Sequence, residues 1–171
     1  MAQSVFPATT SDDWTLISSV TPTAGATTVS FTSISGYKKL LLRANAPQLA
    51  TNGNCTLTFN SDSGANYDWA SMGTDTTPIA SSVVNLGATS IALGTGSANG
   101  PKLHLTIDEV STANKKTLSG FVQLMYISGN PTRYIDIKGS YFASAAITTV
   151  TLTASTTFAA SGTVALYGVK L

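Results

Sequence analysis

Residues 139–169 read GSYFASAAITTVTLTASTTFAASGTVALYGV, a run of 31 positions without Asp, Glu, Lys, Arg or His. Within this run the segment Thr149–Thr153 alternates threonine with Val150 and Leu152. A two-residue period of this kind is typical of a strand with one buried and one solvated face. The later segment Thr163–Leu171 is apolar on both phases of the alternation, which indicates a strand covered on both faces. We therefore predict two different strands inside one uncharged surface.

Similar short runs recur along the whole chain. They are separated by segments rich in Gly, Asn, Asp, Ser and Pro, which tolerate tight turns. The predicted strands are Trp14–Val20, Thr27–Ile34, Lys38–Asn45, Cys55–Asn60, Lys102–Asp108, Thr117–Ile127, Arg133–Lys138, Ile147–Thr153 and Thr163–Leu171, with a weaker tenth within Ile79–Leu86. This spacing predicts an all-β domain of about nine or ten antiparallel strands, a sandwich or a barrel.

The clearest alternation lies in Lys102–Asp108, where leucine and isoleucine occupy one phase and polar residues, including His104, occupy the other. We expect one face of this strand in the core and the other in solvent or in an interface. Phe121–Ile127 and Val164–Val169 are apolar on both phases, so we predict that they are central strands covered on both sides. The segment Asp108–Leu118 is predicted to be a loop with at most one helical turn.

Composition favours an assembling structural protein. The chain has 171 residues, which suits a single domain, and Thr and Ser together supply 48 of them. Charged residues make up 10% of the chain, against about 25% in ordinary soluble domains. The formal net charge of +1 gives little repulsion between copies, so packing beside identical neighbours is expected. Residues 14–171 form the predicted domain, and residues 1–13 form a polar arm, either a frayed terminus or a segment that docks on a neighbour through Phe6.

The residue composition does not favour binding to nucleic acid, insertion into a membrane or binding of a metal ion. The nine Lys and Arg residues are scattered, whereas nucleic-acid binding draws on a concentrated basic stripe, so no nucleic-acid partner is expected. No apolar run is long enough to cross a membrane, and the first twenty residues lack a secretory signal. The single Cys55 is interpreted as a buried apolar residue. We predict no metal and no cofactor.

Catalytic patterns are also weak. His104 is the only histidine, it lies on an outward strand phase, and no Gly-x-Ser-x-Gly sequence accompanies it. The segment Asn60–Asp68 resembles a calcium loop only superficially, because the glycine is misplaced and the terminal Glu is lacking. Asp62 and Asp68 are the least unsuitable pair of carboxylates for glycoside hydrolysis. No enzymatic activity is predicted, and no catalytic residue is assigned.

Aromatic residues at the ends of elements are the candidate contact residues. Such rings anchor interfaces or stack on sugars, although capping of a core is the commoner role. Tyr167 belongs to a strand that we expect to be covered by a loop or a partner. The candidates for interface or ligand contact are Phe6, Trp14, Tyr67, Trp69, Tyr141, Phe142 and Tyr167.

Three ordered stretches resemble a set of small bacteriophage virion proteins of the tail-fibre and capsid-decoration type. The stretches are VSFTSI at 29–34 running into YKKLLL at 37–42, LTFNSDSGANY at 57–67, and AIT at 146–148 through FAASG at 158–162 to LYGV at 166–169. The resemblance implies a jelly-roll-like β-sandwich, commonly oligomeric, without catalytic residues. It also implies that Asn60 and Asp62 hydrogen-bond nearby backbone in a structural turn above Tyr67.

We therefore expect a non-enzymatic virion structural protein that decorates or cements a particle surface. Its partners would be other capsid or tail proteins and copies of itself, with a trimer as one option, and it would be made in the host cytoplasm. The first alternative is a tail-associated receptor-binding module that contacts a host surface glycan through Tyr67, Trp69 or Tyr141. The second is a glycan hydrolase that uses Asp62 and Asp68.

Overall fold

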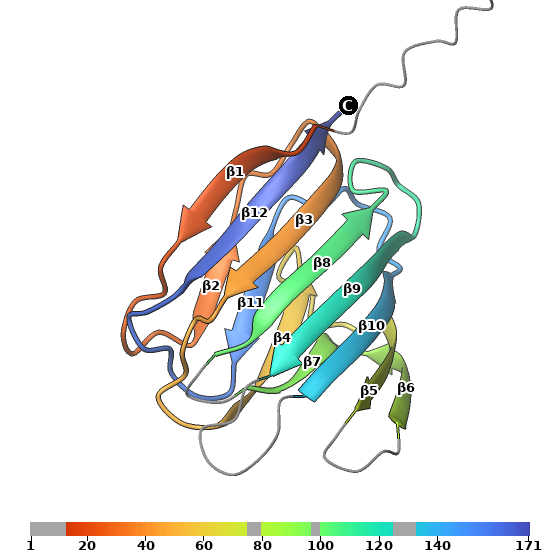
Figure 1. Cartoon of the computed structure of the whole chain (residues 1–171). Coiled ribbons are helices and arrows are strands. Elements are labelled where there is room, and N and C mark those ends of the chain that lie inside the picture. The colour runs from red at the N-terminus through yellow and green to blue at the C-terminus, as the bar shows by residue number, and fades with distance from the viewer. Residues whose placement is uncertain (1–12, 75–79, 97–99, 125–132) are drawn as a thin grey trace, which may run out of the picture.

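Two antiparallel sheets stack face to face in the computed structural model, which describes residues 13–74, 80–96, 100–124 and 133–171 (Figure 1). These residues form twelve strands: β1 (Thr15–Val20), β2 (Thr28–Phe31), β3 (Tyr37–Asn45), β4 (Gly53–Phe59), β5 (Tyr67–Thr74), β6 (Ala80–Ala88), β7 (Ile91–Gly96), β8 (Lys102–Asp108), β9 (Lys116–Leu124), β10 (Arg133–Tyr141), β11 (Val150–Ala154) and β12 (Thr163–Lys170). The larger sheet has eight strands in the order β1-β12-β3-β8-β9-β10-β5-β6, and the smaller has four in the order β2-β11-β4-β7.

The predicted all-β sandwich is confirmed, with twelve strands among the described residues rather than nine or ten. The two strands that sequence analysis missed are β5 and β7. In β5 the inward phase carries small residues, Ser71 and Gly73, while the outward phase carries Met72, so alternation is lost. In β7, Gly94 has a positive φ of 97° and interrupts the apolar pattern after Leu93. Neither segment shows a clear two-residue period.

The core lies between the two sheets and is built from the inward phase of each strand. β8 follows its predicted alternation, with Leu103, Leu105 and Ile107 buried. Burial of each large aliphatic side chain contributes about 1.5–3 kcal/mol to stability. The smaller sheet covers these residues from its own inward phase, through Val29, Phe31, Leu57, Phe59, Ile91, Leu93, Val150 and Leu152.

The two strands predicted to be central, β9 and β12, are covered on their inner face but only partly on their outer face. β9 and β12 both lie inside the larger sheet, with a neighbour on each edge. However, Phe121 of β9 is 50% exposed, and Tyr167 of β12 is half-buried, because both point to the outer face of the larger sheet. Val169 is buried as expected. The prediction of cover on both faces is therefore wrong for Phe121, because the smaller sheet covers only one side of the larger one.

The loop predicted before β9 is present in the structure. Asp108–Leu118 contains turns and no helix, as expected of a loop. Of the predicted arm at 1–13, only Asp13 is among the described residues, so the role of Phe6 stays a prediction. The parts of the chain that the structure describes include no helix that is long and apolar enough to cross a membrane.

Candidate functional site

The turn after β4 is a hydrogen-bonded structural unit. Asn60 and Ser61 both have left-handed backbone, with φ values of 54° and 55°. One side-chain oxygen of Asp62 accepts the Gly64 amide at 2.8 Å, and the other accepts the Asn66 side-chain amide at 2.8 Å. This confirms the predicted structural turn and the bond from Asp62 to nearby backbone.

Asn60 behaves differently from its prediction, because its partners are distant in sequence. Its side-chain nitrogen donates to the Ala146 carbonyl at 2.8 Å, and its oxygen accepts the Thr148 and Thr149 amides at 2.8 and 3.1 Å. Asn60 therefore joins the turn to the segment that enters β11. The sequence motif identified a polar turn but not this long-range bond.

Tyr67 and Tyr141 lie in the core beneath the turn. Their rings stack with centroids 4.9 Å apart, and Phe59 packs against both. The Tyr67 hydroxyl accepts the Phe59 amide at 2.9 Å and donates to the Asp62 carbonyl at 3.1 Å, while the Tyr141 hydroxyl donates to the Asp62 carboxylate at 3.0 Å. Burial raises the pKa of Tyr67 to about 12 and raises that of Tyr141 as well. The burial of both rings favours the core-capping interpretation over contact with a ligand.

Hydrogen bonds also define the state of Asp62. The Gly64 amide, followed by the Asn66 amide and the Tyr141 hydroxyl, lowers the pKa of this carboxyl below its ordinary value. A general acid of a glycosidase needs the opposite shift. Asp68 accepts the Gly87 amide at 2.9 Å, so both aspartates have structural partners within the chain. The geometry of the two carboxylates thus supports a structural role.

Acid is expected to weaken the fold through Asp62. Because its folded-state pKa is lowered, Asp62 contributes stability above the unfolded-state pKa of about 4, and this is lost as pH falls through the folded value. We expect the urea midpoint of the parent chain to fall more between pH 7 and pH 3 than that of Asp62→Asn. Asp136→Asn, which removes an exposed carboxylate, should show the same fall in urea midpoint as the parent chain. An equal fall in all three chains would contradict the role of Asp62 in acid sensitivity.

The remaining candidate aromatic residues lie on the surface in different places. Trp14 precedes β1 and is 39% exposed, and Phe142 follows β10 with the Lys115 ammonium 4.1 Å from its ring centre. Trp69 is half-buried on β5 and packs against the core. Tyr167 lines a hollow on the outer face of the larger sheet. Among the candidates that the structure describes, the fold thus brings Tyr67 and Tyr141 together in the core but places Trp14, Phe142 and Tyr167 apart on the surface. Phe6 lies outside the described residues.

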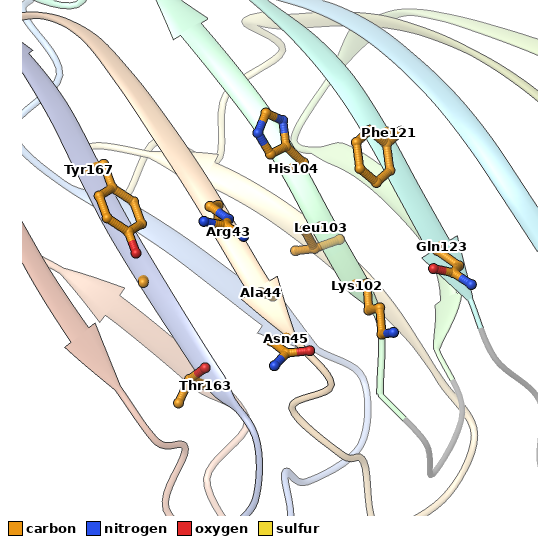
Figure 2. Close-up of a pocket in the computed structure, with 11 residues that line it drawn as sticks. Arg43, Ala44, Asn45, Lys102, Leu103, His104, Phe121, Gln123, Thr163 and Tyr167 are labelled. Carbon is orange, nitrogen blue, oxygen red and sulfur yellow. The ribbon is translucent and has the colours of Figure 1, made fainter. Parts of the chain in front are cut away.

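The hollow that contains Tyr167 has a volume of about 510 Å³ and spans β12, β3, β8 and β9 (Figure 2). We call it the Arg43 hollow. It is lined by Arg43, Ala44, Asn45, Lys102, Leu103, His104, Phe121, Gln123, Thr163, Ala165 and Tyr167. Figure 2 shows Tyr167 on one side and Phe121 on the other, with Arg43 and His104 between them. Of these residues, Tyr167 was predicted as a contact, and Lys102 and His104 were predicted to point outward from the strand Lys102–Asp108.

Strand register assembles the Arg43 hollow. Arg43 pairs with His104, and His104 pairs with Phe121, so the three side chains form one row across β3, β8 and β9. The rings of His104 and Phe121 stack in parallel, with centroids 5.5 Å apart and an interplanar angle of 3°. The alternation in Lys102–Asp108 predicted the outward direction of His104, but the sequence does not show which strands lie beside this one in the sheet.

Two further side chains with reactive groups, Cys55 and Lys116, are buried. Cys55 is fully buried, as predicted, and burial raises the pKa of its thiol to about 11, so it is not an activated nucleophile. Lys116 is buried in the core and donates to the Ala143 carbonyl at 2.8 Å; burial lowers its pKa. Among the described residues, no three His, Cys, Asp or Glu side chains gather to hold a metal ion.

No family model matches the chain, and neither the curated proteins nor the solved structures provide a match.

Proposed function

We propose that the chain is a non-enzymatic structural component of a bacteriophage particle, which decorates its surface and packs against neighbouring subunits. The observation that carries the proposal is the β6 edge of the larger sheet. β6 is the last strand of that sheet, so among the described residues no strand pairs with its outer side. The sequence resemblance to small virion proteins supports a place in a phage particle, and the β6 edge supports packing against a neighbouring subunit.

The β6 edge is exposed on both of its faces. Residues 82–87 are all exposed, and Val84 and Leu86 are 69% and 71% exposed. Val83, on the other phase, is also open to solvent at 48%. Soluble monomers rarely leave a long apolar edge strand without protection, because its free amides and carbonyls can pair with another chain. β6 therefore has the features of an interface strand.

The absence of charged residues around β6 favours a second copy of the chain as its partner. The 26 residues at 76–101 contain no Asp, Glu, Lys, Arg or His. Natural edge strands use lysine or inward-pointing charge to prevent self-pairing, and β6 has neither. Two antiparallel β6 strands would bring valine against valine without like charges in contact. Met72 of neighbouring β5, which is 59% exposed, extends the apolar surface.

The proposal predicts many copies of the chain over the particle. Fluorescently labelled protein, added to particles of the phage that encodes it, is expected to coat the capsid evenly. Val84→Lys should reduce the bound copies at least about tenfold and shift the free protein to a monomer in light scattering, because it places a charge on the β6 edge.

Thr117→Lys is the matched control, since it adds the same charge at an exposed position of the interior strand β9. It should coat particles as the parent does. Label found only at the tail, or coating unchanged by Val84→Lys, would overturn the proposal.

A further inference from the structure

The Arg43 hollow concentrates positive charge on the outer face of the larger sheet. Arg43 and Lys102 lie on the neighbouring strands β3 and β8, on the same face and diagonal to each other. No Asp or Glu lines the hollow, and within the described parts of the chain neither cation forms an ion pair. In the row of Arg43, the carboxylate of Asp136 lies on β10, beyond Phe121. Like charges on adjacent strands repel each other unless an anion offsets them, so the hollow suits an anionic ligand.

Aromatic rings form both sides of the hollow. Phe121 on β9 and Tyr167 on β12 are separated by β3 and β8, and both rings remain accessible to solvent (Figure 2). Ala165, which lies on β12 two residues before Tyr167 and pairs with Arg43, contributes only a methyl group and leaves room above the sheet. An exposed aromatic ring next to polar groups is a favourable surface for an amphipathic ligand. The faces of sugar rings have this combination of apolar C–H groups and polar edges.

Neutral polar groups complete the lining. The side-chain amides of Asn45 and Gln123 and the hydroxyls of Thr163 and Tyr167 border the same hollow. Amides and hydroxyls both donate and accept hydrogen bonds, as the hydroxyl groups of a sugar do. The volume of about 510 Å³ lies within the range of about 300–1,000 Å³ that is usual for small-ligand sites.

From this combination we infer that the Arg43 hollow binds an acidic saccharide, with the sugar carboxylate on the Arg43 guanidinium and the sugar ring against the neighbouring Tyr167 ring. Arginine presents paired N–H donors whose spacing matches the two oxygens of a carboxylate. Lys102 and His104 of β8 line the same hollow, so the Lys102 ammonium and a His104 ring N–H are further donors. The binding would occur on one surface of the folded chain and does not depend on the proposed place in a particle.

The arrangement fits a carboxylated sugar better than a nucleic acid or a bare anion. Two cations in one hollow do not form the continuous basic stripe that a phosphate backbone requires. The other cations of the outer face are separate from them; Lys39, for instance, pairs with Asp108 at 3.4 Å. A bare anion would use Arg43 and Lys102 but would leave the Tyr167 ring and the Asn45 amide at the edge of the hollow without a role.

The test is a titration of the full-length ¹⁵N-labelled protein, followed by NMR, with four probes. They are 3′-sialyllactose, a glucuronate-containing oligosaccharide, neutral lactose and sodium phosphate. We expect at least one acidic sugar to shift the amide signals of Arg43, His104 and Phe121, and to bind about tenfold more tightly than lactose or phosphate. Arg43→Gln should weaken that binding by about tenfold or more, because it removes a charge-assisted pair.

Lys138→Gln is the matched control, since it removes one positive charge from the outer phase of β10, outside the hollow. It should bind as the parent does. If Arg43→Gln does not give the parental amide spectrum, Lys102→Gln replaces it in the comparison. The inference is overturned if neither acidic sugar shifts these signals at millimolar concentration, if lactose or phosphate binds equally well, or if the hollow variant binds as Lys138→Gln does.

Discussion

Gly120→Ala is expected to lower the free energy of unfolding by at least about 4 kcal/mol, which is at the extreme of single-residue effects. Gly120 lies within β9, paired with Leu105 of β8 and with Ile137 of β10. Its φ is +156°, and a Cβ there would overlap the His104 carbonyl oxygen and lie 2.9 Å from the Leu105 Cα. Both of these atoms belong to backbone, so only a separation of β8 from β9 would relieve the overlap.

Urea unfolding followed by circular dichroism measures this effect, together with the yield of soluble protein. Gly25→Ala is the control, because Gly25 also has a positive φ, of +84°, but nothing lies within 4 Å of the position that a Cβ would take there. It should cost about 1–2 kcal/mol for the backbone conformation alone. A Gly120→Ala chain as stable as Gly25→Ala would show that β8 and β9 are not in this close register.

Tyr67→Ala is expected to cost about 3–5 kcal/mol, the range for removal of a large buried aromatic side chain. The change leaves a cavity beside Phe59 and Tyr141, and it removes the hydroxyl that joins the Phe59 amide to the Asp62 carbonyl. Tyr67→Phe keeps the ring but leaves these buried backbone groups without the hydroxyl, so it should cost about 1–3 kcal/mol.

Tyr134→Ala provides the comparison for Tyr67→Ala. Tyr134 points outward from β10 and is 57% exposed, and its replacement should change stability by no more than about 0.5 kcal/mol. The same urea titration measures all three variants. Equal effects at Tyr67 and Tyr134 would contradict the burial of Tyr67 and would return it to the candidate contact residues.

Local sequence pattern predicted most of the strands and the direction of many side chains. The alternation in Lys102–Asp108 correctly separated the buried leucines from the outward His104. It failed in β5, because small residues, Ser71 and Gly73, occupy the inward phase while the apolar Met72 points outward. It also failed for Phe121, because an apolar residue alone does not show whether its face of a sheet is covered.

The candidate sites depended far more on the tertiary structure. The turn motif gave Asp62 its local partners, but not the Tyr141 hydroxyl, which is distant in the chain. Nothing in the sequence indicated that Lys116 is buried, because a lysine at the junction of a polar loop and a strand is ordinarily exposed. The Arg43 hollow could not be predicted from the sequence, because its residues come from four strands whose order in the sheet is set by the tertiary structure.

The sequence by itself determined the β class and the two kinds of strand within residues 139–169, because alternation and composition are local properties. The expected single uncharged surface was wrong, because β11 lies in the smaller sheet and β12 in the larger one. Only the tertiary structure decided that β12 lies between β1 and β3, that Tyr167 faces a hollow and that β6 ends the sheet. These facts depend on pairing between segments far apart in the chain. Such pairing is fixed by how all the inward faces fit into one core, which no single segment specifies.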